Sequence, residues 1–449
     1  MPGSNRKRNS LEKLLNLFTE VRPGESGTTL LLALNVFILL TAYYIIKPVR
    51  EALILTGGGA EIKSYASAGQ VLLMAFTVPL YSHLAGRFER RKLISLVTLF
   101  FMACLVVFYF LVLAKVSVGV VFFLWVGIFN LMVVAQFWSF ANDVYTPEEG
   151  KRLFVIIAFG ASLGAVAGSR VAGVLLDVVG IAQLLLVSSA LLGLSIVLTN
   201  VVDTRERGRR DAEESPRVTE TSEPGPPQEE VGKTSGFQLV LRNRYLLMIA
   251  FLMLLANWVN TNGEFILGRM VSAAAEQAAA ADPSGAIDAG AWIGKFYSNF
   301  FFGVNLLGVI LQLFIVSRIL KYLGIRVALL ILPVTALLGN LMVVALPLLT
   351  YLRWTKTAEN ATDYSLQNTV RNVLFLPCTR EEKYNAKQAI DTFFVRAGDV
   401  FSAGLVYLGT TALTLSVQAF AAVNVVLVGV WIVLALAIGR EHRKRTTTG

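Results

Sequence analysis

The residues of this chain that could do chemistry are charged and amide side chains inside long apolar segments. Residues 358–375, AENATDYSLQNTVRNVLF, carry Glu359, Asp363, Gln367 and Arg371 at steps of four. An α-helix turns by about 100° per residue, so steps of four keep these side chains on one face. A charge at the bilayer centre costs about 2.5 to 3.5 kcal/mol and usually faces a cavity or a partner. We predict that this face lines a transport cavity; a helix lying on the membrane surface is the alternative.

A second charged group follows a pair of tyrosines. The segment TAYYIIKPVREALIL, residues 41–55, places Lys47, Arg50 and Glu51 within about one helical turn. Lys47 and Glu51 are four residues apart, which suits an ion pair along one helix. Arg50 would still need a partner, so binding of a polar solute is the other interpretation.

A third group combines amides with a carboxylate. In NWVNTNGEFILGRM, residues 257–270, Asn257, Asn260 and Glu264 share one helical face, and Arg269 follows them. These side chains suit hydrogen bonds either to a polar ligand or to neighbouring helices. Other charged residues within apolar segments are Arg170, Asp391, Arg396 and Asp399.

The elements that must position these residues are membrane-spanning helices. Only 16% of the 449 residues are charged, 55% are hydrophobic, and the mean hydropathy is +0.63. Crossing the hydrocarbon core takes about 20 apolar residues. We therefore predict an all-α membrane protein with twelve transmembrane helices, the tenth and eleventh despite internal charges. The predicted spans are 27–46, 64–85, 93–114, 118–141, 153–176, 181–201, 245–270, 292–316, 327–346, 348–375, 388–412 and 416–438.

Positive charge predicts the orientation of these spans. With the N-terminus inside, the cytoplasmic loops and both tails hold 29 of the 40 Lys and Arg residues, as the positive-inside rule requires. We expect a multi-pass protein of the inner (cytoplasmic) membrane with both termini cytoplasmic. The predicted domains are a cytoplasmic N-terminal segment (1–26), a six-helix half (27–201), a cytoplasmic linker of disordered composition (202–244), a second six-helix half (245–438) and a basic tail (439–449).

The two halves resemble each other. Lys63-Ser-Tyr recurs as Lys295-Phe-Tyr after 232 residues, Thr146-Pro-Glu-Glu recurs as Thr379-Arg-Glu-Glu after 233, and Gly168 matches Gly404 after 236. Such a repeat predicts a site between the halves that opens alternately to each side. Small residues in the fifth and eleventh spans would let helices approach closely.

The loop GRFERRKLI, residues 86–94, resembles the signature at the corresponding loop of the major facilitator superfamily, which holds helix ends in one conformational state. The resemblance predicts a major facilitator-like fold. It also assigns gating roles to Gly86, Glu89, Arg90 and Arg91.

Composition excludes several functions. Two cysteines and two histidines indicate neither a disulfide framework nor a metal cluster. The basic residues are dispersed among loops, so we expect lipid headgroups rather than nucleic acid as partners. No Gly-x-x-x-x-Gly-Lys-Ser/Thr motif occurs, which argues against an ATP-driven pump. We expect no enzymatic activity, no catalytic residues, no metal and no cofactor.

Three segments resemble the plastid and bacterial ATP/ADP translocases, a family of nucleotide transporters. They are FWSFANDVYTPEEGKRLFVIIAFGASLGAVAGS (137–169), KPVREALILTGGGAEI (47–62) and NAKQAIDTFFVRAG (385–398). The resemblance implies exchange of ATP for ADP or related nucleotides without hydrolysis, and it adds Asn142 to the candidate residues. The predicted substrate-binding residues are Lys47, Arg50, Glu51, Asn142, Arg170, Asn260, Glu264, Arg269, Lys295, Glu359, Asp363, Gln367, Arg371, Asp391 and Arg396.

Two other functions stay open. The acids nearly neutralise the bases of the candidate set, which suits a proton-coupled carrier of another polar or anionic solute, with Glu264, Glu359 or Asp363 binding the proton. A receptor that does not transport is the third interpretation. We expect a monomer in each case.

Overall fold

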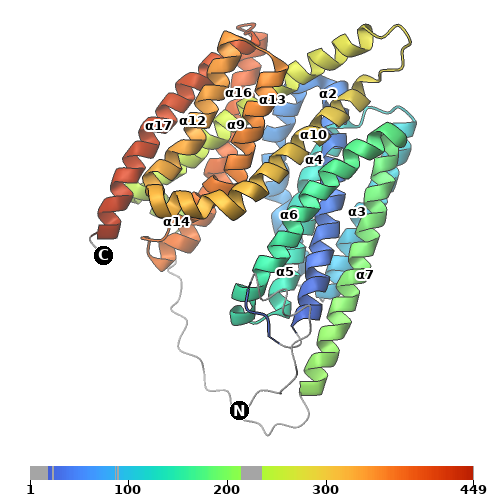
Figure 1. The fold of residues 1–449 in the computed structure, drawn as a ribbon, viewed down its shortest axis with the longest axis vertical. Coiled ribbons are helices and arrows are strands. Elements are labelled where there is room, and N and C mark those ends of the chain that lie inside the picture. Colours follow the sequence, from blue (N-terminus) through green and yellow to red (C-terminus); the bar gives the residue numbers. More distant parts are fainter. Residues whose placement is uncertain (1–18, 23–24, 86, 88–89, 214–234, 448–449) are drawn as a thin grey trace. The chain divides into compact units, whose positions relative to one another are not determined.

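The computed structural model describes residues 19–22, 25–85, 87, 90–213 and 235–447, and every regular element in these ranges is a helix (Figure 1). The first part contains α2 (Ser26–Ala85), α3 (Arg90–Leu113), α4 (Gly119–Phe129), the π-helical turn η1 (Asn130–Val134), α5 (Ala135–Val144), α6 (Pro147–Val178) and α7 (Ile181–Glu213).

After the linker the chain is also helical. It contains α8 (Gly236–Arg242), α9 (Arg244–Ala280), α10 (Ala289–Ile310), η2 (Leu311–Ile315), α11 (Val316–Arg318), η3 (Ile319–Leu323), α12 (Gly324–Ala345), α13 (Leu349–Thr362), η4 (Asp363–Gln367), α14 (Asn368–Leu374), η5 (Glu382–Ala386), α15 (Lys387–Ala389), η6 (Ile390–Phe394), α16 (Val395–Thr411) and α17 (Val417–Thr447).

Among the described residues, 8 helices are long and apolar enough to cross a membrane. Two of these helices are composite: Ser26–Tyr81 holds the first two predicted spans and Ala289–Ala345 holds the eighth and ninth, so the eight helices account for ten of the twelve spans. The tenth and eleventh predicted spans correspond to the helical segments 349–374 and 382–411. Within α2, Gly59 has a φ of 74°. Glycine adopts such a φ at no steric cost, and the break separates the first two spans.

The chain folds into two compact units. Unit 1 comprises Met1–Ala52, Met74–Glu223 and Tyr297–Phe302, and unit 2 comprises Leu53–Leu73, Pro224–Phe296 and Gly303–Gly449. The units follow the predicted halves except at residues 53–73 and 297–302. Local contacts explain both exceptions, because Lys63 forms an ion pair with Glu264 of α9, and Ser298 donates a hydrogen bond to the carbonyl of Ser169 in α6.

In unit 1, α6 packs closely on α2 through a row of glycines. A Cβ atom added at Gly160 would lie 2.6 Å from the carbonyl oxygen of Ala33, and one at Gly168 would lie 2.5 Å from that of Thr41. Gly164, between them, meets the α2 backbone in the same way. The predicted close approach at the fifth span is therefore confirmed, because only glycine leaves room for two helix backbones at this distance.

The matching prediction for the eleventh span points to the wrong glycine. Nothing lies within 4 Å of a Cβ atom added at Gly404. The close contact is made instead by Gly398, where an added Cβ atom would lie 2.8 Å from the backbone oxygen of Leu254 in α9.

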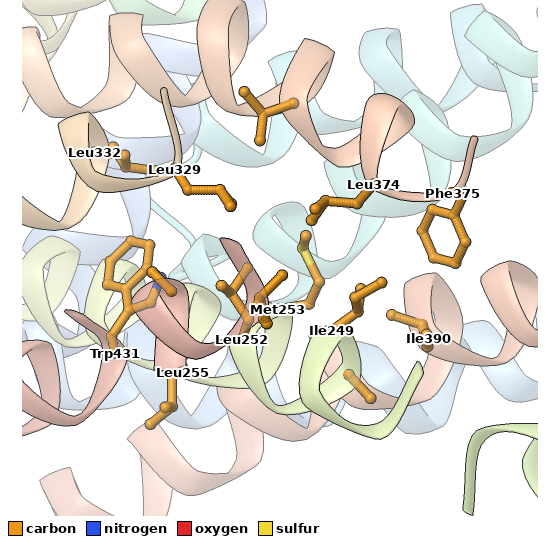
Figure 2. Close-up of a cluster of buried hydrophobic side chains, with 14 of the residues drawn as sticks. Ile249, Leu252, Met253, Leu255, Leu329, Leu332, Leu374, Phe375, Ile390 and Trp431 are labelled. Carbon is orange, nitrogen blue, oxygen red and sulfur yellow. The ribbon is translucent and has the colours of Figure 1, made fainter. Parts of the chain in front are cut away.

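The apolar core of unit 2 lies between α9, α12, α14 and α17. Figure 2 shows Ile249 and Met253 of α9 beside Leu329 of α12 and Leu374 of α14, with Trp431 of α17 at one end of the cluster. All five side chains are buried. This packing holds the helices that carry the predicted polar face of residues 358–375.

The two parts of the chain share local structures at the predicted offset. Thr146 and Glu149 form a reciprocal cap, in which the N–H of Thr146 donates to Glu149 (2.9 Å) and the N–H of Glu149 donates to Thr146 (3.4 Å). Thr379 and Glu382 form the same pair of bonds at 2.9 and 3.3 Å. The turn η4 also begins 233 residues after η1, at residue 363 against residue 130. These matches support the internal repeat.

A buried ion pair fixes the entry of α2 to the start of α6. The Arg152 guanidinium donates to both carboxylate oxygens of Glu25, at 2.9 and 3.1 Å. Burial alone would raise the pKa of Glu25, but the hydrogen bonds from Arg152 and from the backbone N–H of Arg22 outweigh burial and hold the pKa below the ordinary value of 4.5. A lowered folded-state pKa means that this stabilisation is present above the unfolded-state pKa and is lost as the pH falls through the folded-state pKa.

We expect Arg152→Gln to lower the free energy of unfolding at neutral pH by about 1 to 3 kcal/mol, since a hydrogen-bonded charge loses its partner. The difference from wild type should shrink as the pH falls below the ordinary value of 4.5. Thermal unfolding across this pH range measures both effects. Arg207→Gln is the control, because Arg207 is 61% exposed in its pair with Asp203 and its loss should change little. An unchanged gap at low pH would refute the role of Glu25.

Candidate functional site

A polar cavity lies within unit 2. Its lining comes from α9, α12, α13, η4, α14, α16 and α17 and consists of Met253, Ala256, Asn257, Asn260, Leu332, Glu359, Asp363, Gln367, Arg371, Val395 and Trp431. The four residues predicted to share one face, Glu359, Asp363, Gln367 and Arg371, therefore face one cavity. Their binding of a substrate stays a prediction.

A π-helical turn interrupts the helix that carries these four residues. Residues 358–362 and 368–374 are α-helical, whereas Asp363–Gln367 form η4. π-helical turns are rare and occur frequently at functional sites. The prediction assumed a regular α-helix, and the turn is the local feature that it did not contain.

Lys356 is a buried cation at this site that the sequence analysis missed. It is 2% exposed, and its Nζ lies 2.9 Å from Glu359 Oε1 and 3.0 Å from Asn260 Oδ1. Two predicted residues from α9 and α13 are thus joined by a third. The signal was present in the sequence, because a lysine three residues before a glutamate in an apolar span indicates a local ion pair.

Glu264 and Arg269 of α9 contact the part of α2 that belongs to unit 2. Glu264 accepts from the Nδ2 of Asn360 (3.1 Å) and lies 3.7 Å from the Nζ of Lys63. Arg269 lies 3.5 Å from the carboxylate of Glu61. Neither residue lines the cavity, so the structure brings them to a separate polar contact between α9, α13 and α2.

Asp391 and Arg396 form ion pairs beside the cavity. Arg371 lies 3.5 Å from Asp391, and Arg396 lies 3.3 Å from Asp399. Asp399 also accepts a hydrogen bond of 2.8 Å from Asn257. Internal pairing, one of the two interpretations of the charges in the eleventh span, is what the structure shows.

In unit 1, the charged group after the two tyrosines is surrounded by aromatic rings. The Nζ of Lys47 lies 4.1 Å from the centre of the Phe301 ring and 5.1 Å from that of Tyr44. Arg50 pairs with Glu51, and its guanidinium lies 4.9 Å from the Phe123 ring centre. Cations over aromatic faces gain about 0.5 to 2 kcal/mol, more when water is excluded.

The remaining candidates do not line a cavity. Asn142 and Lys295 are exposed. Arg170 is also exposed, 5.8 Å from the Phe302 ring centre. These three positions were selected by charge or by resemblance, and neither criterion tests whether a side chain faces a cavity.

The predicted gating loop is described only in part. Gly86 and Glu89 lie outside the described residues, and Arg90 begins α3. Arg91 donates to Asn200 (2.9 Å) and Asp203 (3.2 Å) of α7. This contact ties the start of α3 to the end of α7 within unit 1.

Long apolar helices, two units with a shared repeat and a polar cavity enclosed by helices define a multi-pass membrane transporter. The chain belongs to the Major Facilitator Superfamily, whose sequence profile matches residues 29–359. This membership confirms the predicted fold class, an all-helical major facilitator-like membrane protein. A search of curated proteins found no match.

Solved structures share the fold at low sequence identity. A bacterial homologue of the human lysosomal transporter Spinster, inward-facing and unoccupied, has a TM-score of 0.59 at 16% identity over 95% of this chain and 99% of that one. The nucleoside transporter NupG has a TM-score of 0.62 at 13% identity, covering 92% and 98%. The peptide transporter POT in complex with sulfate has a TM-score of 0.59 at 13% identity, covering 98% and 99%.

Proposed function

We propose that this major facilitator exchanges nucleotides, ATP against ADP or a related pair, across the inner membrane by alternating access. Both termini would be cytoplasmic and the transporter monomeric. The observation that carries the proposal is the cluster of Lys47 and Arg50 with Tyr44, Phe123 and Phe301 in unit 1. It lies in one of the three segments that resemble the ATP/ADP translocases.

The chemistry of this cluster suits a nucleotide. Ammonium and guanidinium groups form strong, charge-assisted hydrogen bonds with phosphate oxygens. Aromatic faces stack on nucleobases regardless of base identity. By contrast, Arg371, Arg396 and Lys356 of unit 2 already pair with carboxylates, so they offer less net positive charge to a polyanion.

Exchange in proteoliposomes tests the proposal. Vesicles loaded with ADP should take up labelled ATP, and empty vesicles should not. Lys47→Gln should reduce the initial rate by about tenfold or more, the equivalent of losing one charge-assisted contact of about 1.4 kcal/mol. Lys444→Gln is the matched control, because this side chain is 77% exposed in the C-terminal helix. Failure to take up any nucleotide would overturn the proposal.

A second candidate is a proton-coupled carrier of another polar or anionic solute. It is favoured by the two carboxylates, Glu359 and Asp363, that line the unit 2 cavity. Uptake driven by a pH gradient in vesicles without internal substrate would support this candidate over exchange.

A further inference from the structure

The unit 2 cavity contains buried polar groups that no described residue satisfies. Both amide atoms of Gln367, the Nε of Arg371 and the indole Nε1 of Trp431 are buried without a hydrogen-bond partner in the described part of the chain. Gln367 and Trp431 are each only 2% exposed, and all three line the cavity. An unsatisfied buried polar group costs about 1 to 3 kcal/mol, so these groups require water or a small polar ligand. The cavity has room for a few water molecules.

Asp363 differs from the other carboxylates of this region. Glu359 pairs with Lys356, Asp391 pairs with Arg371, and Asp399 pairs with Arg396. Asp363 forms no ion pair and no hydrogen bond with any residue that the structure describes. An ionised carboxylate in an apolar span is costly without a partner. Protonation removes that charge, and water in the cavity supplies hydrogen bonds to either form.

The groups around Asp363 are few. Lys356 and Glu359 on α13 and Arg371 on α14 are the charged groups that act on it electrostatically. The other elements of the cavity contribute side chains that do not titrate in this pH range: α9 contributes the amides of Asn257 and Asn260, and α12, α16 and α17 contribute Leu332, Val395 and Trp431. Because Lys356 and Arg371 each have an acidic partner, Asp363 is the carboxylate left over.

The repeat provides an internal comparison in unit 1. The turn η1 begins at Asn130, the position that corresponds to Asp363 at the offset of 233. A second small cavity lies close by, and its lining includes Gln136, whose amide atoms also lack a partner among the described residues. No carboxylate lines this cavity. Both halves thus hold a glutamine in a small cavity near a π-helical turn, but only unit 2 adds an acid.

We propose that Asp363 takes up and releases a proton in each transport cycle. The proton passes from a hydronium ion to a carboxylate oxygen of Asp363 and leaves a water molecule behind. Gln367, Arg371 and Trp431 hold the water through which the proton reaches the carboxylate. The proposal rests on the proposed transport function but not on the identity of the solute.

Infrared difference spectra of the protein in lipid nanodiscs test the proton site without measuring transport. Between about pH 5 and pH 8, where carboxyl groups outside their ordinary range titrate, wild type should show the carbonyl stretch of a protonated carboxylic acid. Asp363→Asn should abolish this band. Asp363→Glu should keep it at a shifted frequency, and Asp288→Asn, at the exposed N-cap of α10, should leave it unchanged. Absence of the band in wild type, or its persistence in Asp363→Asn, overturns the proposal.

Transport then separates this proposal from the proposed function. Wild-type uptake should respond to a pH gradient, and Asp363→Asn should lose that response while Gln136→Leu, in the unit 1 cavity, keeps it. A titrating Asp363 in a protein that moves no nucleotide would sink nucleotide exchange and leave the proton site standing. Nucleotide exchange that is indifferent to pH, in a protein without the infrared band, would do the reverse.

Discussion

Lys356→Met is expected to lower the free energy of unfolding by about 3 to 5 kcal/mol, because it leaves the carboxylate of Glu359 buried without its cation. The ammonium is 2% exposed and bonds both Glu359 and Asn260, so water cannot replace it without opening the helices. Methionine keeps most of the volume and removes the charge. Unfolding in detergent by a denaturant titration measures the loss.

The double variant Lys356→Met with Glu359→Gln is the informative control. It removes both charges, so much of the lost stability should return. Lys444→Met, on a side chain that is 77% exposed, should change little. If Lys356→Met were as stable as wild type, the pair would not be buried as the structure has it.

Gly164→Ala is expected to destabilise the protein by about 1 to 3 kcal/mol through overpacking. The added Cβ atom would meet the backbone carbonyl of Phe37 in α2, and a backbone atom cannot turn aside as a flexible side chain can. The melting temperature and the fraction of monodisperse protein in detergent report the effect.

Gly404→Ala is its matched control. This glycine also lies inside a helix, but nothing lies within 4 Å of the added Cβ atom. Alanine is a better helix former than glycine by about 1 kcal/mol, so this variant should be neutral or slightly more stable. Equal losses in both variants would show that backbone flexibility, rather than the contact with α2, sets the cost.

The fold was predictable because it depends on properties that act over short stretches of sequence. Length and hydropathy are enough to locate membrane spans, and the offset between Thr146 and Thr379 was enough to suggest a repeat. Steps of four likewise placed Glu359, Asp363, Gln367 and Arg371 around one cavity. The π-helical turn was not foreseeable, since its sequence, Asp363–Gln367, has no composition that separates it from an α-helix.

Partners of the charged residues were harder to predict because they come from distant parts of the chain. Lys63 meets Glu264 across 201 positions of sequence, and no local pattern connects them. Selection by charge alone also gathered Arg170 and Lys295, which are exposed, and passed over Lys356, which is buried in the network. Spacing identifies a face, but it does not identify what packs against that face.

The π-helical turns also bear on the history of the chain. Each turn holds one residue more than an α-helix needs to join the same flanking segments, so a single-residue deletion within 363–367 would leave a continuous helix. The turns start at residues 130 and 363, at the offset of the capping pairs that begin with Thr146 and Thr379. One insertion in an ancestral half, older than the duplication that joined two such halves, accounts for both.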